Sequence, residues 1–355
     1  MHLIKRLSII FLWIFFIFAV LYFPKWRIVP TKEKSLNVFV WGDALSLSVL
    51  SEFEKETGIK VHLSFFATNE ELQVKMQATG GVGYDLIMPS NYTTKLLIDQ
   101  DLLKPLDKER LPFINQLNPL LLNHTFDPGN QYSIPYSWEI YGLGYDQTYF
   151  KDGSFIPSWK AVYDKEVIDY KIAVQNDPIE SVAIAAFYLF GKPENVTPEK
   201  FLKIKELLLQ QRNWVEAYSD FRAPYFIATG NCPVAVTTNS YIRRIHDFYP
   251  NIDFVLPKEG SFITIENLCI PKASTKDKYI YKLLQYLYTK DSMRRHYEEF
   301  GFFPAYLLPY EKLSIYPYEK KLLEITPEEF SKLHFFKNLI PQQQVRDLWV
   351  EVKSY

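Results

Sequence analysis

The chain has 355 residues, of which 48% are hydrophobic and 17% aromatic, and it carries 40 basic and 41 acidic side chains. Beyond position 34 there are 34 basic and 40 acidic residues, a net charge of −6, which disfavours a nucleic-acid-binding protein and is compatible with a cationic small molecule. The sequence has no CxxC, no HExxH and no close pair of histidines, so we expect no metal site.

Residues 1–34 are predicted to be an export signal or a membrane anchor. Lys5 and Arg6 precede an uncharged apolar run from Leu7 to Pro24. No cysteine stands directly after the run, which excludes lipid attachment at a lipobox. No small-x-small cleavage site stands out near residues 23–29 either, so an uncleaved anchor is favoured slightly over a cleaved signal. Either segment would send the rest of the chain across a membrane. We therefore expect a periplasmic protein, exported or tethered to the inner membrane.

A strand is predicted at residues 38–41, and it ends on Trp41, Gly42 and Asp43. An apolar, β-branched and aromatic run of this kind is typical of a strand buried in a parallel sheet. In open α/β sheets ligands bind beyond the carboxyl ends of the strands. An indole and a carboxylate both attract an organic cation, so Trp41 and Asp43 are candidate ligand contacts. The alternative, a core tryptophan and a helix-capping aspartate, is favoured by this stretch alone.

Residues 47–90 are predicted to continue as helix, strand, helix and strand. A helix ends at Gly58, a strand follows over 59–65, a helix over 69–78, and a strand over 84–89. This β-α-β-α-β order predicts a wound α/β sheet. Ser90 and Tyr92 leave the third strand as Trp41 leaves the first, so parallel strands would direct both exits into one crevice.

Residues 140–145 are predicted to cross from a first lobe to a second, because 355 residues are too many for one core. Gly142 and Gly144 are the hinge candidates in this crossing. Further on, Asp177 follows a short strand and precedes Pro178 and Glu180, a pattern typical of a helix N-terminus. Helix-capping propensity alone is enough to explain both carboxylates. In the functional alternative, both side chains point into the cleft between the two lobes.

The remaining segments predict a strand over 259–271 that returns to the first lobe, a long amphipathic helix and a helical tail. Cys232 and Cys269 lie in or beside apolar runs. Buried free thiols are the favoured interpretation, and a disulfide in an exported chain is the alternative.

The sequence resembles the bacterial periplasmic spermidine/putrescine-binding proteins, the PotD-type receptors of polyamine ABC transporters. The resemblance runs from about Leu36 to about Pro304. Five blocks in fixed order carry it: FVW at 39–41, FEKETGIKV at 53–61, YDLIMPSNY at 84–92, FDPGNQYSIPY at 126–136 and PKEG at 257–260.

The resemblance implies a two-lobe α/β fold of the periplasmic-binding-protein type II kind, each lobe a wound, mostly parallel sheet flanked by helices. Lobe 1 would comprise 35–142 with 267–311, and lobe 2 would comprise 143–266 with 312–355. The implied function is an extracytoplasmic receptor that captures a polyamine between the lobes and delivers it to an ABC permease. We expect a monomer without cofactor and without enzymatic activity, since Asp177 and Glu180 lack a nucleophile, metal motif or cofactor loop beside them.

The resemblance also implies the ligand contacts. The positions that match the family's contacts are Trp41, Asp43, Ser90, Tyr92, Asp177, Glu180, Glu266 and Phe302. A family tyrosine beside the first acidic residue is Ala44 here, and two second-lobe tryptophans fall on Thr237 and Thr264. The carboxylates are retained while part of the aromatic box is lost, which leaves a different cationic or amino-bearing metabolite as the alternative ligand.

Overall fold

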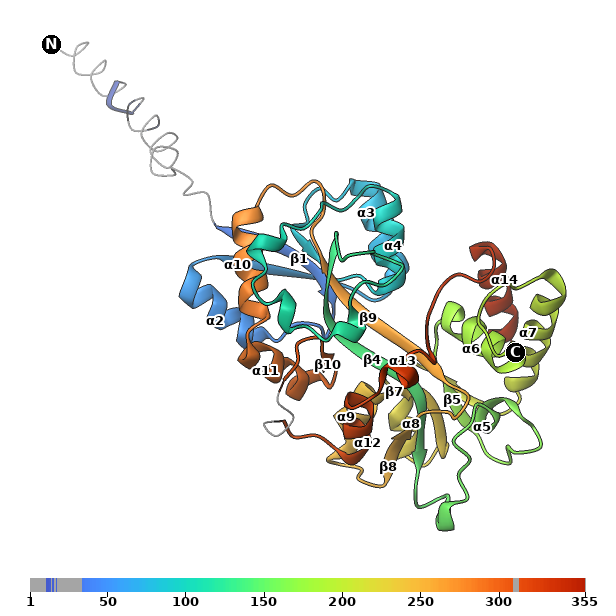
Figure 1. Ribbon diagram of the computed structural model, residues 1–355. Helices are drawn as coiled ribbons and strands as arrows, with labels where there is room; N and C mark the ends of the chain where they lie inside the picture. Colours follow the sequence, from blue (N-terminus) through green and yellow to red (C-terminus); the bar gives the residue numbers. More distant parts are fainter. Residues whose placement is uncertain (1–10, 14, 16, 18–33, 309–312, 355) are drawn as a thin grey trace.

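The computed structural model describes residues 11–13, 15, 17, 34–308 and 313–354. The predicted signal or anchor at 1–34 lies largely outside these residues. Within the described ranges, no helix has the length and apolar character needed to cross a bilayer. From residue 34 on, the described chain is a mixed α/β structure in which helices surround a long, curved array of strands (Figure 1).

The first sheet begins with the predicted β-α-β-α-β unit. Its three N-terminal strands are parallel in the order β2-β1-β3, and Val38 of β1 lies opposite both Leu63 and Leu86. The elements of this unit are β1 (Ser35–Trp41), α2 (Leu47–Thr57), β2 (Lys60–Phe66), α3 (Asn69–Thr79), β3 (Leu86–Ile87) and α4 (Asn91–Asp99). Three short 3-10 helices follow at Lys108–Arg110, Ile114–Gln116 and Pro119–Leu121.

Local signals explain the ends of these elements. Helix α2 ends at Gly58, whose φ of 65° is left-handed and whose N–H bonds the carbonyl of Glu54, as the sequence predicted. The buried face of this helix comprises Val49, Leu50 and Phe53. Leu47, the first residue of this helix, is 67% exposed.

Two long antiparallel strands, β4 (Ser133–Asp146) and β9 (Ser261–Cys269), connect the first sheet to the second (Figure 1). Residues 133–140 of β4 pair with β9, and residues 141–146 pair with β7 (Val234–Thr238) and β8 (Ile252–Val255). The change of partner falls inside the crossing predicted at 140–145. The residue boundaries of the two lobes stay a prediction.

Gly142 and Gly144 lie in this crossing for a reason of packing. A Cβ on Gly142 would lie 2.6 Å from the ring of Phe254, and one on Gly144 would lie 2.7 Å from Cδ1 of Ile242. Neither glycine has a positive φ. The close approach of the neighbouring strand and helix therefore accounts for both glycines, and their role as a hinge stays a prediction.

The second sheet has three parallel strands in the order β7-β5-β6. Its elements are the 3-10 helix Lys151–Gly153, α5 (Lys160–Tyr163), β5 (Ile172–Val174), α6 (Pro178–Phe190), α7 (Pro198–Gln211), β6 (Val215–Tyr218), α8 (Ala223–Ala228) and α9 (Asn239–His246). The remaining elements are α10 (Asp277–Leu287), α11 (Lys290–Phe300), β10 (Phe303–Pro304), α12 (Pro317–Leu323), α13 (Pro327–Phe330), β11 (Leu333–Phe335) and α14 (Gln342–Lys353).

The C-terminal tail contains a strand that the sequence did not predict. β11 pairs in parallel with β9, with Leu333 opposite Ser261, and α14 then packs on α6 and α7 (Figure 1). Both cysteines are free and buried, as the favoured interpretation had it. The architecture confirms the predicted α/β fold, with parallel strands in each sheet and antiparallel strands β4 and β9 between them.

Candidate functional site

Carboxylates from both sheets gather where β4 and β9 connect them. One follows β1, one lies in β4, one lies in β9, two open helix α6, and one follows β6. These residues are Asp43, Glu139, Glu266, Asp177, Glu180 and Asp220. The charges of four of them, Asp43, Glu139, Asp177 and Asp220, each raise the pKa of at least one other member of the group. The group therefore acts as one electrostatic unit although its members come from five segments of the chain.

Trp41 and Ser90 lie at the ends of β1 and β3, as the sequence predicted, and both contact Glu266 of β9. Trp41 Nε1 donates a 2.8 Å hydrogen bond to Glu266 Oε2, and Ser90 and Glu266 form an antiparallel bridge. The pKa of Glu266 is raised to about 8, mainly by burial and also by the charges of Glu139 and Asp43, while the Trp41 bond opposes the rise. The fold therefore brings a buried acid with a raised pKa against an indole.

Asp177 caps helix α6. Its carboxylate accepts backbone hydrogen bonds of 2.7 Å from Ile179 and 3.0 Å from Glu180, and Pro178 occupies the first helical position. The capping interpretation therefore describes its local geometry. Burial nevertheless raises the pKa of Asp177 to about 6, against the lowering effect of these two bonds, with Asp220 contributing to the rise. An ordinary exposed cap would not show this rise, so Asp177 belongs to the acidic group as well.

Glu180 is the second acid at the start of helix α6. Tyr141 O–H donates a 2.5 Å hydrogen bond to Glu180 Oε1. Burial raises the pKa of Glu180 well above its ordinary value, and the charges of Asp177, Asp220 and Glu139 add to the rise. Glu180 keeps some accessible surface, so it is surrounded by protein without being sealed from a ligand.

Tyr92, in the first turn of helix α4, interacts electrostatically with Asp177 of the acidic group. Its hydroxyl accepts a hydrogen bond from the side-chain amide of Asn338, in the segment after β11. Burial raises the pKa of Tyr92, and the charges of Glu70 and Asp177 contribute. The structure therefore places Tyr92 near the acids of helix α6.

Glu139 is a member of the group that the sequence analysis missed. It is 7% exposed in the middle of β4 and accepts a 2.5 Å hydrogen bond from Ser240 Oγ. Burial raises its pKa, while hydrogen bonds from Ser240 and Thr238 lower it. The signal available in the sequence was a carboxylate in the interior of a mainly apolar and aromatic strand, SIPYSWEIYGLGYD, whose other acid, Asp146, is its last residue.

Arg244 is the second residue that the sequence analysis missed. Its Nη1 forms an ion pair with Asp43 Oδ2, and its Nε donates a 2.8 Å hydrogen bond to the carbonyl of Phe300. The guanidinium carbon lies 5.0 Å from the ring centroid of Tyr241 and 5.0 Å from that of Phe302. Asp43 and Phe302, predicted as ligand contacts, both contact a cation of the protein itself.

Thr237 and Thr264 occupy the walls where the family resemblance implied tryptophans. Thr237 lies opposite Gly142 on β4, and Thr264 lies opposite Glu139. The hydroxyl oxygen of each is buried without a hydrogen-bond partner in the described part of the chain. The site wall is therefore polar at two positions where an aromatic box was expected.

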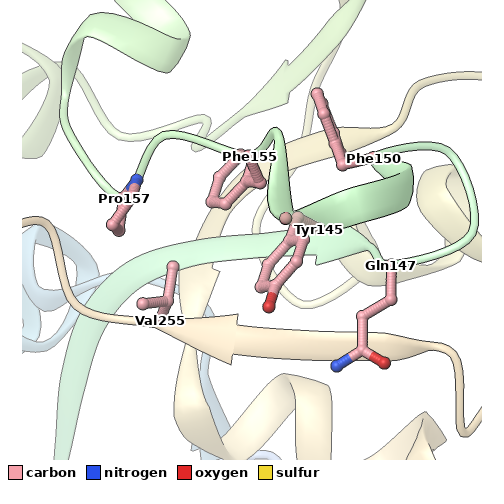
Figure 2. A pocket seen from close by; sticks show the side chains of 7 residues that line it. Tyr145, Gln147, Phe150, Phe155, Pro157 and Val255 are labelled. Atoms are coloured by element: carbon pink, nitrogen blue, oxygen red, sulfur yellow. The ribbon is translucent and has the colours of Figure 1, made fainter.

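A separate cavity of about 360 Å³ lies at the far end of β4 (Figure 2). Its lining is aromatic and apolar, and the rings of Tyr145 and Phe155 stack with centroids 4.2 Å apart. The lining residues are Tyr145, Gln147, Phe150, Gly153, Phe155, Pro157 and Val255. None of the clustered carboxylates lines it, so this cavity is distinct from the candidate site.

Among the residues that the structure describes, no three or more His, Cys, Asp or Glu side chains are placed to hold a metal ion.

The comparisons with known proteins agree with this architecture. The model of the family described as bacterial extracellular solute-binding protein matches residues 48–307. The chain is 30% identical over 263 residues to spermidine/putrescine-binding periplasmic protein 1 of Haemophilus influenzae, covering 74% of this chain and 72% of that protein. It is 32% identical over 257 residues to the putrescine-binding periplasmic protein SpuD of Pseudomonas aeruginosa, covering 68% and 70%.

A solved structure extends the likeness to almost the whole chain. The spermidine/putrescine ABC transporter substrate-binding protein PotD of Streptococcus pneumoniae superposes with a TM-score of 0.77 at 25% identity. The match covers 91% of this chain and 99% of that one.

Proposed function

The chain belongs to the bacterial extracellular solute-binding protein family, and from this membership we propose that it captures a polyamine and delivers it to an ABC permease. The relatives described above are named for binding spermidine or putrescine. The observation that carries the proposal in this chain is the group of carboxylates that both sheets contribute to one site.

Such a group of acids favours an organic cation for a simple electrostatic reason. Carboxylates in a poorly hydrated site repel one another and take up protons, which is why the pKa of Asp177 rises to about 6 and that of Glu266 to about 8. A ligand ammonium can replace those protons and form charge-assisted hydrogen bonds. The gain is largest when acids from both lobes reach the same ligand, so binding favours the closed arrangement.

The proposed contacts divide into polar ends and a hydrophobic wall. We assign Asp177 and Glu180 to one ammonium group and Glu266 to the other, while Asp43, which is paired with Arg244, completes the acidic surface near Glu266. The remaining contacts pack on the methylene chain or complete the wall, and they are Trp41, Ser90, Tyr92 and Phe302. All of these roles are binding roles, and we propose a monomeric periplasmic receptor that performs no catalysis and binds no nucleic acid.

Isothermal titration calorimetry on the purified full chain tests the proposal. Putrescine and spermidine are titrated, with 1,4-butanediol as the uncharged control of matched carbon length. Heat from an amine at micromolar concentration, with none from the diol, is the expected result. A folded sample that binds neither amine would contradict the polyamine assignment.

Thr237 and Thr264 favour one alternative within the same site. Their hydroxyl groups stand where two flat aromatic walls were expected, so the ligand can be another cationic or amino-bearing metabolite. Agmatine and ornithine in the same titration distinguish this alternative, which requires one of them to bind more tightly than either polyamine.

A further inference from the structure

We propose that the guanidinium of Arg244 permanently occupies one cation position of the site and thereby restricts the receptor to short amines such as diamines. The inference rests on the proposed function and concerns the ligand length that the same site accepts. Nothing in the family resemblance assigned a role to this residue.

The surroundings of Arg244 are those that a ligand ammonium group would require. Asp43 supplies a carboxylate, the carbonyl of Phe300 accepts a 2.8 Å hydrogen bond, and two aromatic rings lie with centroids 5.0 Å from the guanidinium carbon. A carboxylate and a carbonyl flanked by aromatic faces is a general recognition site for an organic cation. Here the chain fills that site with its own side chain.

Four segments converge to hold this side chain. Arg244 comes from helix α9, Asp43 from the turn after β1, Phe300 from the end of α11, and Phe302 from the residues that follow it. The Arg244 side chain is 22% exposed and that of Asp43 is 39% exposed, so the pair is partly open to solvent. A side chain bound from so many directions is fixed in place.

The fixed guanidinium shortens the space available to a ligand cation. A second ammonium group near Asp43 would face the like charge of Arg244 instead of a free carboxylate. The acids that keep their capacity for a ligand are Glu266, Asp177 and Glu180, which hydrogen-bond to an indole, a tyrosine hydroxyl and backbone amides instead of a cationic side chain. The charge of Arg244 already acts on Glu139 and lowers its pKa. Amino groups at the two ends of a short chain match these acids, whereas the third amino group of spermidine would extend toward Arg244.

Removal of the guanidinium tests the inference by the ratio of two affinities. Titration calorimetry on the full chain compares putrescine with spermidine for the wild type and for Arg244→Ala. We expect the wild type to bind putrescine at least about tenfold more tightly, and Arg244→Ala to tighten spermidine binding about tenfold, the size of a charged contact. Arg244→Met, which fills the volume without the charge, is expected to act in the same direction and serves if the alanine variant does not fold.

Two further variants separate charge from the general loss of an arginine. Arg244→Lys keeps a positive charge at the position and should keep the preference for putrescine. Arg295→Ala removes an arginine of the same 22% exposure, which forms a 2.6 Å ion pair with Glu52, a residue outside the acidic group. This control should leave both affinities unchanged.

The outcomes discriminate between the inference and the function on which it rests. Wild-type protein that binds spermidine as tightly as putrescine, or a ratio that Arg244→Ala and Arg244→Met leave unchanged, would overturn the role of Arg244 while the polyamine function stands. Absence of binding to either amine by folded wild type and folded variants would refute both. Tighter binding of the amino acid ornithine, whose carboxylate can pair with the Nη2 of Arg244, would also overturn the inference.

Discussion

The two ends of the acidic group differ in how their carboxylate charges are compensated. At the Asp43 end the chain supplies its own cation, since Arg244 pairs with the carboxylate between two aromatic rings. At the Asp177 and Glu180 end the acids receive backbone amides and a tyrosine hydroxyl, and their pKa values rise. A ligand cation can therefore stabilise the carboxylates only at the end of the group where no side chain of the protein already supplies a positive charge.

Of the changes considered, a lower pH is expected to have the largest effect on putrescine affinity. Ligand ammonium needs ionised carboxylates, and the pKa values of Asp177 and Glu266 rise to about 6 and about 8 in the empty site. Below these values each acid must release its proton before it binds the cation, so affinity falls as pH falls. For one displaced proton the fall is about tenfold per pH unit. Calorimetry of putrescine at pH 8, 7, 6 and 5 measures it, and a pH-independent affinity would contradict the proton exchange.

The substitution Glu180→Gln tests the Asp177 and Glu180 end of the group, where no cationic side chain pairs with the acids. The amide keeps an oxygen that can accept the hydrogen bond from Tyr141, yet it loses the charge that attracts the ligand. We expect putrescine affinity to fall by about 1.5–3 kcal/mol, the size of a charge-assisted hydrogen bond. Calorimetry gives the affinity and thermal unfolding gives the stability. A variant that unfolds at lower temperature but binds normally would assign Glu180 to structure alone.

The substitution Asp43→Asn tests the end where Asp43 pairs with Arg244. The variant keeps the shape of the side chain and leaves the guanidinium of Arg244 without its anionic partner. Because both side chains are partly exposed, we expect a loss of about 1 kcal/mol in the free energy of unfolding. Putrescine affinity should change less than in Glu180→Gln. A larger loss of affinity in Asp43→Asn would mean that the ligand, and not Arg244, pairs with Asp43.

Asp177→Asn is expected to have the smallest effect on folding. Asparagine caps helices about as well as aspartate, so it can accept the hydrogen bonds from Ile179 and Glu180. The free energy of unfolding should stay within about 1 kcal/mol, while putrescine binding weakens in the same direction as for Glu180→Gln. Denaturant unfolding and calorimetry on one sample measure both quantities. Unchanged affinity would leave Asp177 with capping as its role.

The sequence by itself determined the features that depend on neighbouring residues. Strand β1 follows from its apolar run, the end of helix α2 from Gly58, and the start of helix α6 from Asp177 and Pro178. Periodicity and caps act over a few residues, so a single sequence is enough to find them. The meeting of Trp41 with Ser90 at one sheet edge also followed, because parallel strands end on the same side.

Only the tertiary structure decided which groups pair inside the site. Trp41 bonds Glu266 across 225 residues of sequence, and Arg244 pairs with Asp43 across 201. Glu139 looked like one charge in an apolar strand, and β11 looked like part of a tail, until their partners were in place. Such contacts depend on how distant segments pack, and no local pattern encodes the partner. The sequence therefore determined the fold and the acidic character of the site, whereas packing decided which acid is neutralised by the chain and which remain for a ligand.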